Sequence, residues 1–247
     1  MGLLDKKDIY LTGSGVRSFL DLTLYAQKVL KECEVVFTLI DIHSLQDYLK
    51  EITKRTVDLI PKYYREGRHR FEIYKDVANH IIEAARKERP VVLLLHGHPL
   101  VYSTVSQLIL KMAKEENFSV EVIPGISALD RIFVDLNLDI SQKGIQIFEA
   151  SAALHYQIDL NPRVDCILFQ IGAPLGPIHE ARPTRADDIY PLRDYLLKFF
   201  PPSHEVTVVE SSVELGIETK LTKGPLGDLT KLAPAFNYTA SLYIPGI

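Results

Sequence analysis

The sequence predicts an α/β protein made of two α/β halves. Short apolar, β-branched runs alternate with longer amphipathic stretches, which is the pattern of βα units. The apolar runs of the first half are nearly continuous, and strands of that kind are buried on both faces of a parallel sheet covered by helices. The chain has 247 residues, 47% of them hydrophobic, which is enough for one large α/β unit or two modest domains.

The first half contains the clearest βα units. Residues 8–13 (DIYLTG) form a predicted strand, and Ser18 can cap the helix expected after the following turn. The next predicted elements alternate strand and helix, at residues 34–40, 71–88, 90–97, 103–116 and 119–125. We therefore expect a mostly parallel sheet in this half.

The pattern changes after Pro124 and Gly125. A further helix leads to strands that alternate more strictly, predicted at residues 145–150, 164–172, 204–211 and 238–245. The Pro-rich residues 173–184 predict a surface loop ahead of a helix at 189–199. We place a domain boundary near residue 124 and expect an N-terminal domain of residues 1–124, a C-terminal domain of residues 125–247, and a cleft between them.

The composition argues against several kinds of partner. Lys and Arg total 28 against 32 Asp and Glu, so no global positive field would gather nucleic acid or an anionic membrane. No stretch reaches the roughly 18 apolar residues of a membrane-spanning helix. Cys33 and Cys166 lie in apolar runs, as buried thiols do, which fits a reducing compartment. We expect a cytoplasmic protein that binds neither nucleic acid nor membrane.

Three glycine-containing turns follow predicted strands, at residues 13–15 (GSG), 96–99 (HGHP) and 124–125 (PG). Open α/β sheets bind ligands at the carboxyl ends of their strands, so the three turns favour a small ligand between the domains. Other interpretations stay open for each. The first turn can be a tight turn without a ligand, and as a nicotinamide site it lacks the third glycine of the fingerprint, because Ser18 stands there. His96 and His98 could hold a metal, although neither Cys nor carboxylate adjoins them. Ser127 with Asp130 can be a capping box.

Residues 62–74 contain three tyrosines, three arginines and one histidine. Arg70 and Tyr74 lie one helical turn apart, so their side chains can point together. A basic, aromatic segment can be a solvated face or a lid. As a binding site, its phenol and guanidinium groups would grip a peptide or another flexible polar substrate.

Taken together, these motifs resemble the tetrapyrrole methylases, S-adenosylmethionine-dependent methyltransferases with the cofactor between two α/β domains. The resemblance covers essentially the whole chain. Within that class the sequence is similar to the borosin enzymes, which α-N-methylate backbone amides of a peptide that matures into a natural product. The specific motif follows PGIS and reads xxLFxDLxxDxxxxGxQxxEA; it is carried by Ile132, Phe133, Asp135, Leu136, Asp139, Gly144, Gln146, Glu149 and Ala150.

The resemblance implies particular site residues. The catalytic Tyr-x5-Arg-x3-Tyr arrangement of the borosin enzymes matches Tyr64, Arg70 and Tyr74. A further active-site tyrosine of those enzymes, directly before the Gly-His-Pro turn, is His96 in this chain. That departure could change which groups transfer protons and which substrate is bound. No metal is implied. The residues expected to bind the cofactor are His98, Pro99, Val101, Tyr102, Ser127, Ala128, Gln170, Ile171, Gly172 and Ala240.

We expect Tyr64 to remove the amide proton, with its pKa lowered by Arg70, while Arg70 and Tyr74 stabilise the oxyanion. Fused borosin enzymes carry their substrate as a C-terminal tail, and this sequence ends at Ile247. We therefore expect a split system, in which a separate precursor peptide binds in trans to a homodimer, giving a heterotetramer with two peptides. Two alternatives remain: a small-molecule methyltransferase of the wider class, and an inactive homologue that binds cofactor or peptide without turnover.

Overall fold

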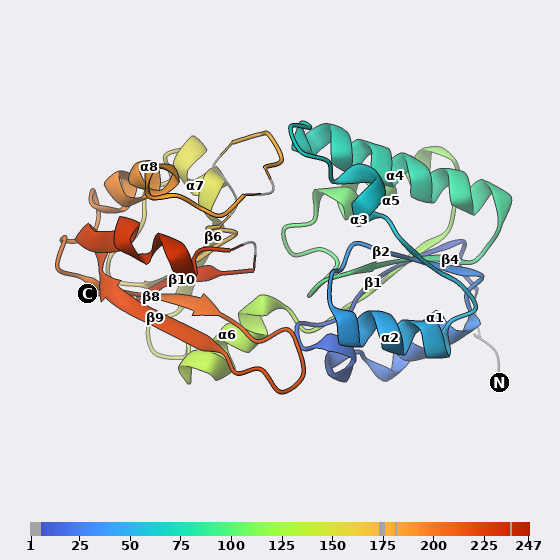
Figure 1. The fold of residues 1–247 in the computed structure, drawn as a ribbon, viewed down its shortest axis with the longest axis horizontal. Coiled ribbons are helices and arrows are strands. Elements are labelled where there is room, and N and C mark those ends of the chain that lie inside the picture. The colour runs from blue at the N-terminus through green and yellow to red at the C-terminus, as the bar shows by residue number, and fades with distance from the viewer. Residues whose placement is uncertain (1–5, 173–175, 181, 238) are drawn as a thin grey trace. The chain divides into compact units, whose positions relative to one another are not determined.

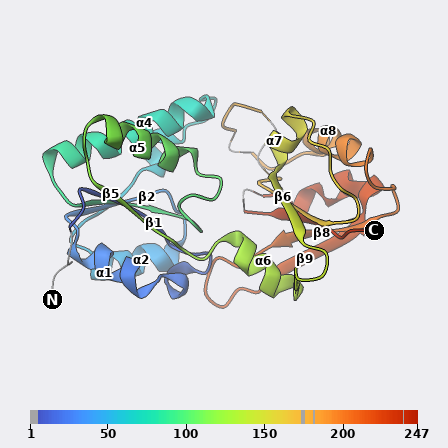
Figure 2. The same cartoon turned by 180° about the vertical axis from the view of Figure 1, so that it is seen from behind.

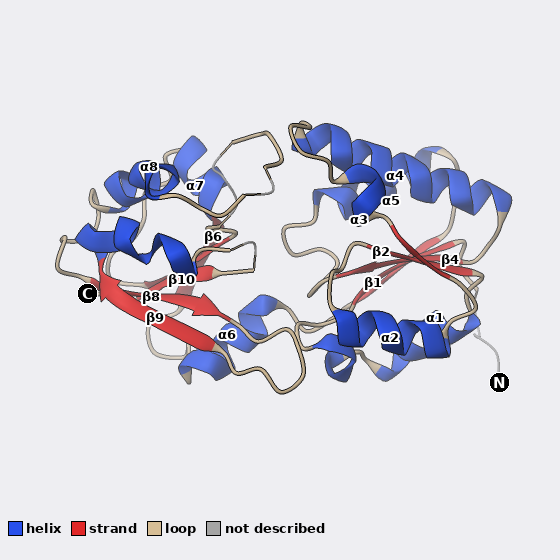
Figure 3. Cartoon of the chain, viewed as in Figure 1, coloured by secondary structure: helices blue, strands red, loops and turns tan. Residues whose placement is uncertain are grey.

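The structure is a computed structural model that describes residues 6–172, 176–180, 182–237 and 239–247. The chain forms two compact units, each with one five-stranded sheet and its own helices (Figures 1 and 3). The first unit comprises Met1–Arg131 and Ser212–Ile217, and the second Ile132–Ser211 and Glu218–Ile247. The predicted α/β class with two sheets is confirmed.

The sheet of the first unit is entirely parallel, with strand order β3-β2-β4-β1-β5. Residues of β1, β2 and β4 are all buried, as their continuous apolar runs predict. Helices cover both faces of this sheet. The strands are β1 Ile9–Gly13, β2 Val35–Thr38, β3 Thr56–Asp58, β4 Val91–Leu95 and β5 Val120–Ile123.

Successive residues of each strand enter two different cores. Ile9 and Leu11 pack under helices α4 (Arg70–Lys87) and α5 (Thr104–Glu115), whereas Tyr10 packs under α1 (Leu24–Glu32) and α2 (His43–Ile52). The two helix pairs lie on opposite faces of the sheet (Figures 1 and 2). This layering leaves the carboxyl ends of the strands at one edge, where the turns predicted to bind a ligand emerge.

The segment after β1 differs from the prediction. Ser18 does not cap the following helix; it begins a short 3-10 segment, Ser18–Asp21, with φ of 49°. Helix α1 begins at Leu24, and the Thr23 side chain caps it by accepting a hydrogen bond from the Ala26 N–H at 3.0 Å. Periodicity located the apolar face of the helix, but the capping side chain decided where it starts.

Helix α2 and strand β3 were not predicted. The three residues of β3 are partly or fully exposed, so this strand has no strong apolar period. Helix α2 does carry one, because Leu45, Tyr48, Leu49 and Ile52 face the core at helical spacing, and the sequence prediction overlooked it. The first turn of α2 is held by a distant segment: the Glu214 carboxylate accepts hydrogen bonds from the His43 N–H at 2.8 Å and the Ser44 hydroxyl at 2.5 Å. This contact ties Ser212–Ile217 to the first unit.

The second unit has a mixed sheet of order β6-β7-β10-β8-β9. Strands β6 and β7 are parallel, whereas the pairings of β10 with β7 and β8, and of β8 with β9, are antiparallel. The exposed polar strand β9 and the short helix α7 were not predicted. The elements are α6 Ala128–Leu136, β6 Ile145–Glu149, α7 Ala150–His155, β7 Asp165–Phe169, α8 Ala186–Leu196, β8 Glu205–Glu210, β9 Lys220–Pro225, the 3-10 segment Leu226–Ala235 and β10 Ser241–Ile244.

Both cysteines are buried, as predicted, and burial raises the pKa of each thiol, Cys33 and Cys166, to about 12. A thiol with such a pKa stays protonated and unreactive at neutral pH. Within the described ranges, no helix has the length and apolar character needed to cross a bilayer.

Three glycines allow the backbone turns at the carboxyl ends of β1, β4 and β5 to pack on one another. A Cβ atom added to Gly13 would lie 2.1 Å from the Gly97 carbonyl oxygen and 3.0 Å from the Gly125 Cα, and one added to Gly125 would lie 2.5 Å from the same oxygen. Gly15 and Gly97 exchange two backbone hydrogen bonds, of 3.2 and 2.9 Å. Only glycine permits this close approach.

Gly13→Ala should lower the free energy of unfolding by about 1–3 kcal/mol, because the new methyl group overlaps a carbonyl oxygen of a buried turn. Urea denaturation followed by circular dichroism measures the loss. Gly176→Ala is the matched control, since a Cβ there meets no atom of the described residues within 4 Å. Equal stability of the two variants would contradict the close approach of the three turns.

Candidate active site

The structure brings Tyr64, Arg70 and Tyr74 together on two consecutive elements. Tyr64 directly follows the short helix α3 (Ile60–Tyr63), and its N–H donates to the Ile60 carbonyl. Arg70 is the first residue of α4, and Tyr74 lies one turn further along. Both tyrosine side chains pack against the core under α4 and α5, and both Tyr74 and Arg70 act electrostatically on the Tyr64 phenol. We call these three residues the Tyr–Arg cluster.

The expectation for the Tyr64 phenol was wrong in sign. Burial raises the pKa of Tyr64 above its ordinary value of about 10, and the nearby Tyr74 phenol raises it further. Arg70 lowers the Tyr64 pKa, as predicted, but its effect is smaller than that of burial. The Tyr64 side chain is therefore protonated at neutral pH in the free protein.

His96 follows β4, and burial lowers its pKa below 6.5. Asp21 opposes this effect, because its carboxylate favours the charged imidazolium. The Asp21 carboxylate also accepts hydrogen bonds from the N–H groups of Val16 and Arg17, at 3.0 and 2.8 Å. The electrostatic neighbour that acts on His96 is thus Asp21 rather than a member of the Tyr–Arg cluster. Sequence reasoning missed Asp21, which follows Gly15 by six positions and holds the first glycine turn.

The His98 side chain stabilises its own turn. Its Nδ1 atom accepts a hydrogen bond from the Leu100 N–H at 3.1 Å, and its carbonyl accepts one from the Val101 N–H at 3.2 Å. Pro99 beside it is buried, and Tyr102 adopts the left-handed region with φ of 52°. A non-glycine residue in that region is common at ligand sites.

Large apolar side chains are exposed at the carboxyl ends of β4 and β5. Leu100, Val101, Tyr102 and Ile126 are 39%, 42%, 40% and 39% exposed. Ser127 and Asp130 form the predicted capping box: the Ser127 N–H and hydroxyl each donate to the Asp130 carboxylate at 2.7 Å, and the Asp130 N–H donates to the Ser127 hydroxyl at 3.3 Å. Ala128 then begins α6.

The predicted cofactor residues of the second unit also meet. A Cβ atom on Gly172 would lie 2.0 Å from the Asn237 carbonyl oxygen, which accepts a hydrogen bond from the Ala240 N–H at 3.1 Å. Gln170, at the end of β7, has φ of 59°, and Ile171 and Ala240 are buried. The turn at residues 170–172 and the start of β10 therefore form one surface. Asn237 carried no sequence signal.

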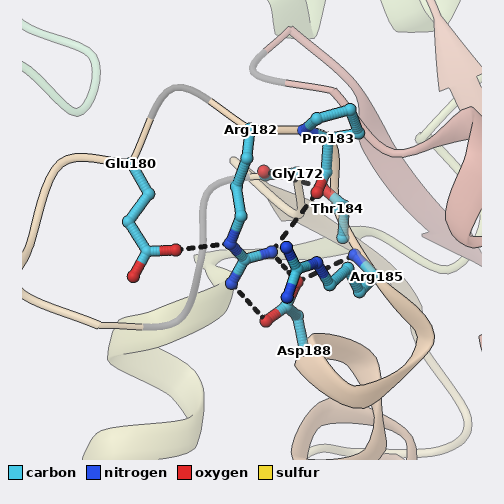
Figure 4. Close-up of polar contacts among 7 residues, drawn as sticks. All are labelled: Gly172, Glu180, Arg182, Pro183, Thr184, Arg185 and Asp188. Atoms are coloured by element: carbon cyan, nitrogen blue, oxygen red, sulfur yellow. Dashed lines mark hydrogen bonds and ion pairs between the residues drawn. The ribbon is translucent and has the colours of Figure 1, made fainter. Parts of the chain in front are cut away.

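Figure 4 shows the polar contacts around Gly172, the last residue of this turn. The Thr184 hydroxyl donates to the Gly172 carbonyl at 2.9 Å. Arg182 donates two hydrogen bonds to Asp188, of 2.6 and 2.8 Å, and one to Glu180, of 2.5 Å. These bonds from Arg182 lower the pKa of Asp188 to about 2. The expected surface loop 173–184 is thus anchored at its end, while residues 173–175 and 181 lie outside the described part.

The motif that carried the borosin resemblance has structural roles in the second unit. Asp135 accepts a hydrogen bond from the Ser211 hydroxyl at 2.7 Å, and Glu149 caps α7 by accepting one from the Ala152 N–H at 2.7 Å. The Gln146 amide donates to two carbonyls of residues 161–164, at 2.7 and 3.1 Å. The motif therefore marks a scaffold rather than a reacting group.

The residues present fit S-adenosylmethionine. The exposed apolar side chains at residues 100–102 and 126 suit an adenine ring or a thioether chain. No group of three or more His, Cys, Asp or Glu side chains suited to a metal ion occurs among the described residues.

His96→Asn should weaken the pH dependence of folding below about pH 6.5. Because the folded-state pKa of His96 is depressed, the unfolded chain binds the proton more readily, so stability is complete above about 6.5 and falls as the pH drops. One such group changes the free energy of unfolding by at most about 1.4 kcal/mol per pH unit. Urea denaturation between pH 7.5 and 5 measures the slope, with the exposed His155→Gln as control. Identical slopes for wild type and His96→Asn would contradict a lowered pKa of His96 in the folded protein.

Comparisons with known proteins agree with this architecture. The chain is 30% identical over 164 residues to a type III borosin precursor methyltransferase of Anomoporia bombycina, which covers 66% of this chain and 19% of the relative. It is 27% identical over 238 residues to a type I borosin precursor methyltransferase of Gymnopilus junonius, which covers 95% of this chain and 56% of the relative. The chain thus spans about half or less of these relatives.

The fold is shared with uroporphyrin-III C-methyltransferase of Thermus thermophilus, solved with S-adenosylhomocysteine. The TM-score is 0.63 at 19% identity, covering 96% of this chain and 91% of that chain. The predicted resemblance to borosin enzymes and to the tetrapyrrole methylase class is confirmed. Residues 8–229 match the family model described as Tetrapyrrole (Corrin/Porphyrin) Methylases, so the chain belongs to that family.

Proposed function

We propose that this S-adenosylmethionine-dependent methyltransferase α-N-methylates backbone amides of a peptide. The observation that carries the proposal is the Tyr–Arg cluster, in which a guanidinium and a second phenol act on a partly buried phenol. The spacing of Tyr64, Arg70 and Tyr74 matches that of the borosin enzymes. In this proposal residues 1–124 supply the reacting groups and residues 125–247 complete the cofactor site.

A backbone amide needs help to react. Its nitrogen lone pair is delocalised into the carbonyl, so methylation requires removal of the N–H proton and stabilisation of the resulting negative oxygen. Tyr64, in its phenolate form, takes the proton from the nitrogen. Arg70 and Tyr74 donate hydrogen bonds to the carbonyl oxygen as its charge develops.

S-adenosylmethionine, when bound, supplies the methyl group as an electrophilic sulfonium. In the first unit His98, Pro99, Val101, Tyr102, Ser127 and Ala128 would hold it, and in the second unit Gln170, Ile171, Gly172 and Ala240. These residues contribute by alignment, because a reacting nitrogen must lie about 3–3.5 Å from the methyl carbon on its line of attack.

A second candidate function rests on His96. The borosin enzymes have tyrosine directly before the Gly-His-Pro turn, and a partly buried imidazole with a lowered pKa in that place is a different acid–base group. This departure favours a small-molecule methyltransferase of the same family as the alternative. Activity on small amines or carbon acids, with none on peptides, would establish it.

Tyr64→Phe and Arg70→Ala should each reduce kcat for peptide methylation by about 10²-fold or more, because they remove the proton acceptor or an oxyanion donor. Mass spectrometry of a candidate precursor peptide, incubated with enzyme and cofactor, counts the methyl groups and locates them on the backbone. The Kd for S-adenosylhomocysteine should stay near the wild-type value. Tyr48→Phe is the control, since its hydroxyl contacts Gln27 at 3.2 Å, outside the cluster.

Loss of cofactor binding in either cluster variant would show that the cluster is part of the cofactor site instead. Two further parts of the proposal are that the precursor is a separate chain and that the enzyme is a homodimer. Methylation of the added peptide in the same assay tests the first part. Size-exclusion chromatography with light scattering, with and without the peptide, tests the second by giving the stoichiometry.

The kcat of peptide methylation should rise with pH without reaching a plateau below about pH 10. The pKa of Tyr64 is raised, so the phenolate fraction grows about tenfold per pH unit across the neutral range. Single-turnover rates between pH 6.5 and 9.5 measure the slope. A plateau beginning near neutral pH would contradict Tyr64 as the proton acceptor and would point to a group such as His96, whose pKa lies below 6.5.

A further inference from the structure

We propose that two contacts between residues 63–68 and α4 are positioning contacts that hold Tyr64 against Arg70 and Tyr74. The first joins Tyr63 to His80, and the second joins Arg68 to Asp76. The inference rests on the proposed function of the Tyr–Arg cluster, and it assigns roles to four residues that lie beside the cluster. We call the two contacts the α4 brace.

The Tyr63 hydroxyl lies 3.0 Å from the Nδ1 atom of His80. The Lys62 ammonium lies 3.4 Å from the same nitrogen, and an ammonium can only donate. Nδ1 is therefore the acceptor for both groups, and the neutral ring carries its proton on Nε2. Phe37 of β2 packs edge-to-face on this imidazole, with ring centroids 5.1 Å apart. The His80 ring is thus fixed from the sheet below and bonded to the residue that precedes Tyr64.

The Arg68 guanidinium pairs with the Asp76 carboxylate at 2.9 Å. His69, which follows Arg68, caps α4: its Nδ1 atom accepts a hydrogen bond from the Phe71 N–H at 3.3 Å. Arg70 is the next residue after the cap. The ion pair and the cap together define where α4 begins, and so where the Arg70 side chain starts.

The order of the contacts explains how they act on Tyr64. Asp76 and His80 are one helical turn apart on α4, so both lie along one side of that helix. Tyr63 contacts His80 and Arg68 contacts Asp76, so residues 63–68 run antiparallel to α4. Tyr64 lies between the two anchors, and its phenol packs on the core beneath α4.

The two contacts are better suited to positioning than to stability. The Arg68 and Asp76 side chains are 31% and 43% exposed, and an ion pair at that exposure adds little to folding. A displacement of a reacting group by about 1 Å, however, can cost on the order of 10²-fold in rate. Loosening the brace should therefore change kcat much more than the midpoint of unfolding.

Tyr63→Phe removes the hydroxyl that bonds to His80 and keeps the ring. We expect kcat for peptide methylation to fall about tenfold, while KM for S-adenosylmethionine and the urea midpoint stay near wild type. Tyr48→Phe, which loses a comparable phenol hydrogen bond on α2, should leave kcat unchanged. Equal kcat values for wild type and Tyr63→Phe would overturn the role of this contact.

Charge reversal tests the second contact. Arg68→Asp and Asp76→Arg should each lower kcat about tenfold, and the double variant, which restores an ion pair of opposite direction, should recover most of the loss. Arg86→Asp is the control, because it breaks the ion pair with Glu116 at the other end of the same helix. Additive losses in the double variant would overturn positioning by this ion pair.

A measurement without turnover separates the brace from the proposed function. The phenol pKa of Tyr64, followed by NMR of ring-labelled tyrosine and assigned with Tyr64→Phe, should lie above 10 in the wild type. It should move toward 10 in Tyr63→Phe and Arg68→Asp, because the loosened phenol gains solvent. An unchanged Tyr64 pKa in both variants refutes the brace. A shifted pKa in a protein that methylates no peptide refutes the proposed function and leaves the brace standing.

Discussion

The close approach of three backbone turns at one edge of the first sheet is the constraint on which the rest of the site depends. Gly13, Gly97 and Gly125 lie at the carboxyl ends of three adjacent strands, and side-chain atoms at the first or third would overlap the Gly97 carbonyl. Because the turns touch, the segments that leave them are fixed relative to the sheet. The exposed apolar residues after Gly97 and the capped start of α6 are therefore placed together at the carboxyl ends of the strands.

Burial and charge compete in the Tyr–Arg cluster, and their balance sets its chemistry. Packing against the core orders the Tyr64 phenol but also raises its pKa, and Arg70 offsets only part of that rise. A phenolate with a raised pKa is a stronger base that is present in fewer molecules. Under the proposed function, such a base suits an amide proton, which is hard to remove, better than it would suit an already acidic group.

The second unit organises its surface differently. Its mixed sheet has one parallel pair, and the turn after that pair packs against the chain entering β10 through Gly172 and Asn237. Two contacts hold the end of the loop that follows: the Arg182–Asp188 pair, and the hydrogen bond from the Thr184 hydroxyl to the Gly172 carbonyl. Charged side chains stabilise this turn from outside, whereas the first unit uses direct backbone contact between glycines. The borosin motif supports the same scaffold through hydrogen bonds such as that of Asp135 with Ser211.

The sequence alone determined the α/β class, the parallel first sheet, the three glycine turns and the spacing of the Tyr–Arg cluster, since periodicity and glycine placement are local properties of the chain. The tertiary structure decided what depends on distant contacts. It showed that burial outweighs Arg70 at the Tyr64 phenol, and that Glu214 holds the first turn of α2. It also revealed β3 and β9, whose apolar periods are too weak to read. Solvent exclusion and partners far along the chain are consequences of packing, and no local pattern encodes them.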